Sequence, residues 1–333
     1  MHEKEEFVKF MDMNGSRGLS QGEKTRNEHS YHRRSFSHDY YNPFIYHIIL
    51  KKAKGCPDFG RIIGDASIPP GTKGCAEVEE TLLGHIIAKQ LVHLPYRFSA
   101  LKLHQFKVMP DHVHFILQVL YKTERHLDDY IDGLKERIAE KYSLRLKKVV
   151  EEDKIFEESY CDKPLYDDRS LDSWYVYIQE NPHRRAMVMQ RKEFFERVHN
   201  LRIGDKTYEA YGNMFLFRNP DKYAVKVNRN DSLEEKRKKK EFWFSEMRKG
   251  AVLVSPFIAE DELDVKKQAI ASGGKIILIQ YKAFRPGYKP ARELFKLCSE
   301  GRLVIVSLGK DEKTPLSREI CKEMNELARE LVG

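Results

Sequence analysis

The sequence predicts an α+β protein with two unlike domains: an N-terminal antiparallel sheet with helices, followed by a smaller C-terminal α/β domain. Three observations support this prediction. The 333 residues are more than one hydrophobic core usually supports. Strand-like segments follow one another in hairpin order in the N-terminal part, whereas strands and helices alternate in the C-terminal part. All 13 histidines precede residue 200, so the two parts also differ in chemistry.

The overall composition is that of a folded protein with a mild positive charge. Lys and Arg number 59 against 51 Asp and Glu, and 41% of the residues are hydrophobic, which excludes wholesale disorder. No apolar run approaches the roughly 18 to 20 residues of a membrane helix. The charged N-terminus lacks the apolar core of a secretory signal. We therefore expect a soluble, intracellular, cytoplasmic protein without a membrane partner, whose charge permits an acidic partner, nucleic acid first.

Composition and periodicity divide the chain into four segments. We expect a flexible basic arm at residues 1–40, a folded domain at 41–200, a charged linker at 201–249 and an α/β domain at 250–333. The expected elements of the first domain are strands at 44–52, 101–108 and 112–119, a loop at 55–74, helices at 77–94 and 127–142, an extended segment at 154–166 and a helix at 170–189 interrupted by Pro182.

The last segment has the alternation of a parallel sheet. Its expected strands are 252–257, 275–281 and 302–308, and its expected helices are 261–272, 291–300 and 316–332. Gly273 and Gly274 precede a strand instead of opening a helix, so they are not a dinucleotide-binding motif. The segment loosely resembles the Rossmann-like core of DNA-processing proteins related to DprA. A nucleotide or DNA contact at Ser255-Pro256 and a purely structural or dimerising role both remain open.

The most informative short motif is His112-Val113-His114 at the start of an apolar strand. Residues two apart in a strand share a face, so both imidazoles can converge on one divalent ion. A histidine pair on a solvated sheet face is the simpler explanation of this pattern taken alone. The five cysteines are scattered without a CxxC spacing, which indicates ordinary reduced thiols.

The residues around the pair carry a family resemblance. Residues 109–114, MPDHVH, resemble the signature of the HUH (His–hydrophobic–His) transposases with a single catalytic tyrosine, most closely the IS200-like, REP-associated tyrosine transposases. Relatives more often have Asn where this chain has Asp111. Residues 177–182, YIQENP, resemble the tyrosine helix of that family, with tyrosine and amide at i and i+4 on one helical face. Arg33-Arg34-Ser35 resembles a short basic motif before the first strand.

This resemblance, which covers about residues 30 to 200, implies a fold, a site and a reaction. The fold is that of HUH endonucleases, a ferredoxin- or RRM-like antiparallel sheet. Tyr177 would be the nucleophile, and His112, His114 and Asn181 would bind Mg²⁺ or Mn²⁺. The implied activity is cleavage and rejoining of single-stranded or hairpin DNA through a 5′-phosphotyrosine, serving DNA transposition, by a homodimer.

Other residues compete for these roles or extend them. Tyr175, Tyr142 and Tyr130 are alternative tyrosines, but only Tyr177 has the i+4 partner Asn181. The candidate phosphate contacts are Arg33, Arg34, Lys135, Arg137, Arg184 and Arg185, and the aromatic residues that could stack on unpaired bases are Tyr40, Tyr41, Phe44, Trp174 and Tyr175. The basic run 236–240 is explained either by a charged helix face or by binding to a nucleic-acid backbone.

Two other functions are consistent with the same residues. The chain could be a non-catalytic hairpin DNA-binding protein that retains the fold. It could also be a metal-dependent phosphodiesterase that uses water, with Tyr177 structural. A covalent protein–DNA adduct would separate the transposase from both alternatives.

Overall fold

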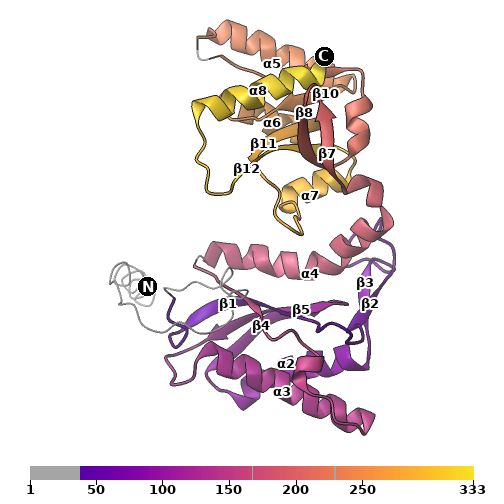
Figure 1. Ribbon diagram of the computed structural model, residues 1–333, viewed down its shortest axis with the longest axis vertical. Helices are drawn as coiled ribbons and strands as arrows, with labels where there is room; N and C mark the ends of the chain where they lie inside the picture. Colours follow the sequence, from indigo (N-terminus) through magenta and orange to yellow (C-terminus); the bar gives the residue numbers. More distant parts are fainter. Residues whose placement is uncertain (1–37, 167, 229) are drawn as a thin grey trace.

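The computed structural model describes residues 38–166, 168–228 and 230–333. It consists of two units, each built on its own sheet, and helix α4 (Asp168–Gln190) lies between them (Figure 1). The predicted basic motif with Arg33 and Arg34 lies outside the described residues. Among the residues that are described, no helix is long and apolar enough to cross a membrane.

The N-terminal unit is a four-stranded antiparallel sheet in the order β4-β5-β1-β6. Its strands are β1 (Phe44–Lys51), β4 (Leu101–Val108), β5 (His112–Val119) and β6 (Cys161–Pro164). The hairpin predicted over 101–119 is confirmed. Helices α2 (Leu82–Arg97) and α3 (Leu127–Leu146) cover one face of the sheet, and α4 covers the other (Figure 1).

The two faces of β5 explain how the site is positioned. Val113, Phe115 and Leu117 are buried in the large core with α2 and α3. Side chains alternate along a strand, so His114 and Ile116 point to the opposite face. Ile116 packs there against Ile178 of α4. The side chains on one face of β5 therefore anchor the strand in the core, while those on the other face lie against α4.

Two segments of this unit differ from the expected elements. The predicted loop and helix start form a small hairpin, β2 (Gly60–Ile63) with β3 (Glu77–Glu80), and α2 begins only after it. Thr81 sets that boundary, because its hydroxyl oxygen accepts a hydrogen bond from the Gly84 amide at 3.2 Å. Helix α4 also continues through Pro182, which is buried, instead of being interrupted there.

The C-terminal unit is a six-stranded mixed sheet in the order β7-β8-β12-β11-β10-β9. The strands are β7 (Glu196–Ile203), β8 (Lys206–Gly212), β9 (Lys222–Ala224), β10 (Val252–Ser255), β11 (Lys275–Lys282) and β12 (Leu303–Lys310). The predicted strands β10, β11 and β12 pair in parallel, as expected, and β9, which was not predicted, pairs in parallel with β10. Strand β8 pairs antiparallel with both β12 and β7. The sheet is therefore mixed and not wholly parallel.

The segment expected as a linker, 201–249, is part of this folded unit. It supplies most of the β7–β8 hairpin, β9 and helix α5 (Leu233–Arg248). Tyr208 and Ala210 of β8 are buried in the core. The charged residues around them in the sequence are the reason why this strand was not predicted. The unit therefore begins before residue 201 and is larger than the 250–333 segment predicted for it.

Helices cover both faces of the C-terminal sheet. Helices α5, α6 (Glu260–Ala271) and α7 (Arg292–Ser299) contribute buried side chains to one core, and α8 (Arg318–Val332) contributes to the other. The described residues also include three 3₁₀ helices: η1 (Glu152–Lys154), η2 (Lys192–Phe194) and η3 (Met214–Arg218). Ser255, at the end of β10, is fully buried, and its hydroxyl oxygen accepts a hydrogen bond from the Phe257 amide at 2.9 Å.

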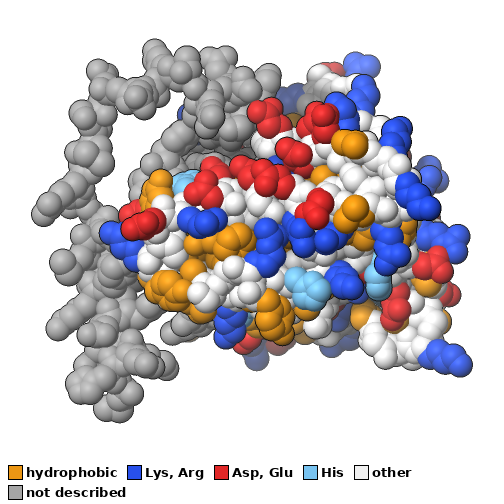
Figure 2. Space-filling model, turned by 90° about the horizontal axis from the view of Figure 1, so that it is seen from below, with side chains coloured by type: hydrophobic (Ala, Val, Ile, Leu, Met, Phe, Trp, Pro, Cys, Tyr) orange, Lys and Arg blue, Asp and Glu red, His pale blue; other side chains and the backbone are white. Residues whose placement is uncertain are grey.

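Charges are interspersed on the α2 and α3 side of the molecule. Figure 2, which views that side, shows basic and acidic side chains intermixed with apolar ones over the described residues. A face with both signs of charge in close alternation gives no strong single-sign field for a polyanion.

Candidate active site

His112 and His114 lie on β5 with their Nε2 atoms 2.7 Å apart. The ring of His114 is almost fully buried, whereas the His112 ring is partly exposed. Both side chains lie on the sheet face that α4 covers. The two ring nitrogens thus converge on one point, as the spacing predicted, and the pair does not sit on an open solvated face.

Asp111 orients the first histidine. Its Oδ1 atom lies 2.7 Å from His112 Nδ1, so a proton on Nδ1 donates to the carboxylate and the Nε2 lone pair is left available. The hydrogen bond from His112, together with the charges of His112 and Arg185, holds the pKa of Asp111 well below its usual range despite partial burial. A carboxylate that stays ionised keeps this orientation over the physiological pH range.

A third histidine, His47 of β1, supports the second one. Its Nε2 atom lies 3.1 Å from His114 Nδ1, and Trp174 of α4 stacks on its ring at a centroid distance of 4.3 Å. Burial, and then the positive charge of Lys163, lower the pKa of His47 to about 4. Sequence reasoning missed this residue, although a single histidine inside the apolar strand 44–52 was a usable signal.

Tyr177 and Asn181 approach the histidine pair from α4. The Tyr177 ring stands nearly perpendicular to the His114 ring, with centroids 5.9 Å apart. Asn181 is buried one turn further along, and its Nδ2 atom donates to the Tyr177 carbonyl oxygen at 3.4 Å. Tyrosine and amide therefore share one helical face that is directed at the sheet histidines.

The competing tyrosines have other structural roles. The Tyr175 hydroxyl is hydrogen-bonded to Nδ1 of His104 at 2.8 Å, on edge strand β4. Tyr130 is buried in the α2–α3 core, and Tyr142 packs against the same core. None of the three lines the cavity that contains Tyr177.

A cavity of about 210 Å³ connects the tyrosine, the metal-ligand candidates and the C-terminal unit. Its first wall includes His112, Tyr177 and Asn181. Arg184 and Arg185, which follow on α4, line the same wall. The opposite wall is formed by Tyr211 of β8, residues 287–290 of the loop between β11 and α7, and Phe295 of α7.

The predicted phosphate contacts behave differently from one another. Arg185 is exposed, with its guanidinium 3.7 Å from the Asp111 carboxylate. Arg184 lies with its guanidinium carbon 5.5 Å from the Tyr177 ring centroid and donates to the Pro290 carbonyl oxygen at 3.2 Å. Lys135 is not the exposed contact that was expected. It is buried on the inward side of α3, where its ammonium donates to the carbonyl oxygens of Glu157 and Glu158.

The basic run on α5 is neutralised by neighbouring acids. Lys236 and Lys240 form ion pairs with Asp261 at 2.9 and 2.8 Å. Lys239 lies 2.6 Å from Asp231, and Arg237 and Lys238 share the Glu234 carboxylate at 2.9 and 3.6 Å. The helix-face explanation of this run therefore accounts for every member.

The donor set suits a small divalent cation. Two imidazole Nε2 atoms converge, one of them oriented by a carboxylate, and the amide of Asn181 lines the same cavity as His112. His, Cys, Asp and Glu alone form no cluster of three or more metal ligands in the described part of the chain. A histidine pair on a central strand, facing a tyrosine on a helix, defines a candidate site for phosphodiester chemistry with a tyrosine nucleophile.

Comparison with protein families agrees with this class of site. Residues 87–181 match the family model described as "Transposase IS200 like". The matched segment contains His112, His114, Tyr177 and Asn181. This match confirms, over residues 87–181, the resemblance to IS200-like transposases that the sequence motifs carry.

Two further comparisons complete these findings. A solved structure of a REP-associated tyrosine transposase bound to a REP hairpin is similar at 10% sequence identity and a TM-score of 0.31, over 45% of this chain and 72% of that chain. A search of curated proteins finds no match.

Proposed function

We propose that this protein is a single-stranded DNA endonuclease and transposase that cleaves and rejoins DNA through a covalent 5′-phosphotyrosine at Tyr177. The observation that carries the proposal is the position of Tyr177 beside the His112–His114 pair, with Asn181 one helical turn away. The IS200-like family match over the same residues supports the transposase class. These four residues would act together in the reaction.

The reaction is a transesterification at phosphorus. The Tyr177 Oη atom attacks the scissile phosphate and forms a new P–O bond, while the bond from phosphorus to the 3′ oxygen breaks. The phenolic proton passes to solvent, and the departing 3′ oxygen takes a proton from water. The phosphotyrosine conserves the ester, so a second 3′-hydroxyl can attack it and reseal a strand without ATP.

The side chains around Tyr177 prepare this step. A Mg²⁺ or Mn²⁺ ion held by His112, His114 and Asn181 would neutralise charge that develops on the phosphate oxygens. Asp111 directs the Nε2 lone pair of His112 toward that position. His47 fixes the ring of His114 from the other side, and so limits the motion of the second donor.

The proposed substrate is hairpin or single-stranded DNA, in line with the sequence resemblance. Arg185 is exposed at the cavity and carries a positive charge near Tyr177, where a DNA backbone would pass. Arg33 and Arg34, from the N-terminal arm, are proposed as additional phosphate contacts. A homodimer is proposed from the same resemblance.

The test is a search for a covalent adduct. The full-length protein is incubated with 3′-labelled hairpin oligonucleotides that tile the DNA flanking its own gene, with Mn²⁺ or Mg²⁺. We expect a labelled protein band that survives denaturation, that Tyr177→Phe abolishes, and that Tyr175→Phe leaves within about threefold of wild type. The Tyr175 variant is the matched control because its hydroxyl is bound to His104 outside the cavity.

The other outcomes distinguish the remaining functions. Cleavage without an adduct, unaffected by Tyr177→Phe, would indicate a water-using phosphodiesterase. Specific hairpin binding without cleavage, unchanged by Tyr177→Phe, would indicate a non-catalytic DNA-binding protein. Either result would contradict the proposed tyrosine mechanism.

A further inference from the structure

The C-terminal unit closes the active-site cavity with a loop that the transposase-family match does not cover. This loop, residues 283–291, connects β11 to α7. Residues 287–290 line the cavity opposite Tyr177 and Asn181. The matched segment ends at residue 181, so the second wall comes from a part of the chain outside the family model.

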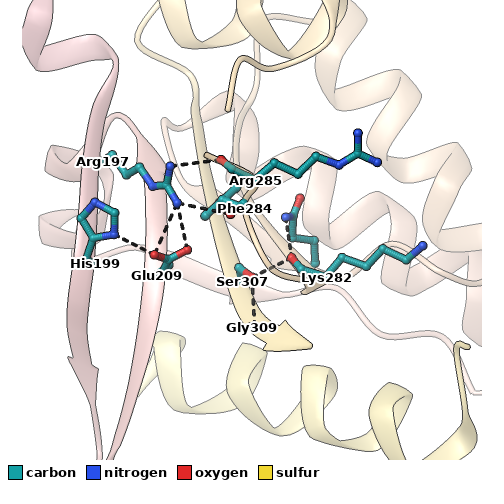
Figure 3. A network of polar contacts seen from close by, with 9 residues as sticks. Arg197, His199, Glu209, Lys282, Phe284, Arg285, Ser307 and Gly309 are labelled. Atoms are coloured by element: carbon teal, nitrogen blue, oxygen red, sulfur yellow. Dashed lines mark hydrogen bonds and ion pairs between the residues drawn. The ribbon is translucent and has the colours of Figure 1, made fainter. Parts of the chain in front are cut away.

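The base of the loop is held by a polar network. Arg197 of β7 donates to the carbonyl oxygens of Phe284 and Arg285, at 3.4 and 3.3 Å, while Glu209 binds the same guanidinium (Figure 3). The Ser307 hydroxyl donates to the Lys282 carbonyl oxygen at 2.7 Å just before the loop begins. A loop whose main chain is fixed at its base can present its tip in a defined position.

Aromatic packing holds the middle of the loop. The Tyr288 ring packs against Phe284 and Tyr211, with centroid distances of 4.6 and 5.2 Å. Burial raises the pKa of Tyr288 to about 12, so its hydroxyl stays protonated. Tyr288 therefore anchors the loop, and its neighbour Lys289 extends from this anchor.

Direct contacts join the loop region to α4. Arg184 donates to the Pro290 carbonyl oxygen at 3.2 Å and lies with its guanidinium carbon 3.9 Å from the Phe295 ring centroid. Arg292 forms an ion pair with Glu180 at 3.0 Å. The partners Glu180 and Arg184 flank Asn181 in the sequence, so these contacts hold the loop against the helix that carries the nucleophile.

We propose that Lys289 is a catalytic residue of the C-terminal unit that contacts the phosphate attacked by Tyr177. This inference rests on the proposed function. Lys289 lines the same small cavity as His112 and Tyr177, and Arg184 and Arg185 bring two further positive charges to it. Three cations around one cavity repel each other, and Asp111, 3.7 Å from Arg185, offsets only part of their charge. A phosphodiester in the cavity would supply further negative charge.

The electrostatics of Lys289 agree with this role. Partial removal from water, and then the charge of Arg185, lower the pKa of its ammonium, while Asp111 raises it. Part of the side chain remains exposed, so the ammonium can reach a phosphate that enters the cavity. A bound phosphate would favour the charged form and so offset the repulsion from the arginines. In the transition state the Lys289 ammonium would stabilise the negative charge on a non-bridging oxygen of the phosphate.

The first test compares rates of adduct formation by the full-length protein with saturating hairpin oligonucleotide and Mn²⁺. We expect Lys289→Ala to slow the reaction about 10- to 100-fold while its affinity for DNA changes less than about threefold. Lys289→Arg should recover much of the rate. The matched control is Lys267→Ala, which changes an exposed lysine of α6 that does not line the cavity.

The second test does not depend on turnover. The Tyr177→Phe protein is treated with an amine-acylating reagent with and without the bound oligonucleotide, and lysine modification is measured by mass spectrometry. We expect DNA to protect Lys289 and to leave Lys267 unchanged. Equal modification of Lys289 in the bound and free protein would overturn the inference.

The outcomes separate this inference from the function on which it rests. A wild-type rate for Lys289→Ala, in a protein whose adduct depends on Tyr177, would overturn only the role of Lys289. Absence of any adduct with the wild-type protein would contradict the proposed function, and this inference with it. An equal loss of rate in Lys289→Ala and Lys289→Arg, with unchanged melting temperature and no protection by DNA, would also overturn it.

Discussion

The molecule contains two groups of basic side chains that are organised in opposite ways. On α5, five consecutive cations, residues 236–240, each lie beside an acid of the same unit. At the cavity, Arg184, Arg185 and Lys289 come from distant positions and surround one small space. Density of charge in the sequence thus does not show where cations gather in the folded protein. Folding brings the three cavity cations together, while the basic run of α5 is paired with Asp231, Glu234 and Asp261.

The largest expected effect concerns His114, the buried member of the histidine pair. We expect His114→Ala to reduce DNA cleavage by at least about 1,000-fold, because the buried imidazole is a proposed metal donor and contacts both neighbouring histidines, His47 and His112. Oligonucleotide cleavage with Mn²⁺ measures the effect. His85→Ala, which changes an exposed histidine at the start of α2, is the control. Retention of more than a tenth of the activity in His114→Ala would refute the metal site.

A smaller effect is expected from the carboxylate that orients His112. Asp111→Ala should raise the Mn²⁺ concentration for half-maximal cleavage about 10- to 100-fold, because the His112 Nδ1 proton loses its acceptor. Asp111→Asn keeps an acceptor oxygen and should shift the half-maximal Mn²⁺ concentration by less than about fivefold. A metal titration of cleavage rate compares the three proteins. An unchanged half-maximal concentration in the alanine variant would show that Asp111 does not support the metal site.

The two groups of cations can be compared directly by DNA binding. Arg185→Ala should weaken binding of a single-stranded oligonucleotide several-fold and reduce the slope of log affinity against log salt by about 0.7, since one phosphate contact is lost. Lys238→Ala on α5 should change affinity less than about twofold, because Lys238 lies 3.6 Å from Glu234, which offsets part of its charge, and lies outside the cavity. Fluorescence anisotropy over a range of salt concentrations provides both values. A larger loss of affinity in Lys238→Ala than in Arg185→Ala would indicate that DNA binds at α5 instead.

The smallest expected effect is on stability. Ion pairs with Lys240 and Lys236 lower the pKa of Asp261 in the folded state. The ionised carboxylate therefore adds to the free energy of unfolding above the unfolded pKa of about 4. This contribution is lost as the pH falls through the lower pKa of the folded state. We expect Asp261→Asn to cost under about 1 kcal/mol at neutral pH, because the pair is partly exposed, and to have no effect in strong acid. Urea unfolding of both proteins at several pH values measures the difference in their free energies of unfolding. A difference that does not change with pH would contradict this role of Asp261.

Local signals in the sequence predicted much of the N-terminal fold. The strands at 101–108 and 112–119 match the structure because an alternating apolar pattern and a Pro-Asp turn act over a few residues. The hairpin of β7 and β8 was missed, since its strands carry many charges and are stabilised by pairing with β12, far away in the sequence. The interruption predicted at Pro182 was wrong, because burial of the surrounding α4 residues overrides the local cost of proline.

The candidate site shows the same difference between residues with local signals and residues placed by long-range contacts. His112, His114, Tyr177 and Asn181 were identifiable because each pair lies within one strand or one helical turn. His47 had one local signal, a single histidine inside an apolar strand, but only the sheet register places it beside His114. Lys289 had none, because the contact between the two units brings it to the cavity.

Peptide mapping would identify the side chain that forms the covalent bond to DNA. The adduct formed by the wild-type protein is digested with protease and nuclease, and the modified peptide is sequenced by mass spectrometry. We predict a nucleotide joined through its 5′-phosphate to Tyr177. Attachment to Tyr175 or another side chain, or cleaved DNA with no modified peptide, would contradict it.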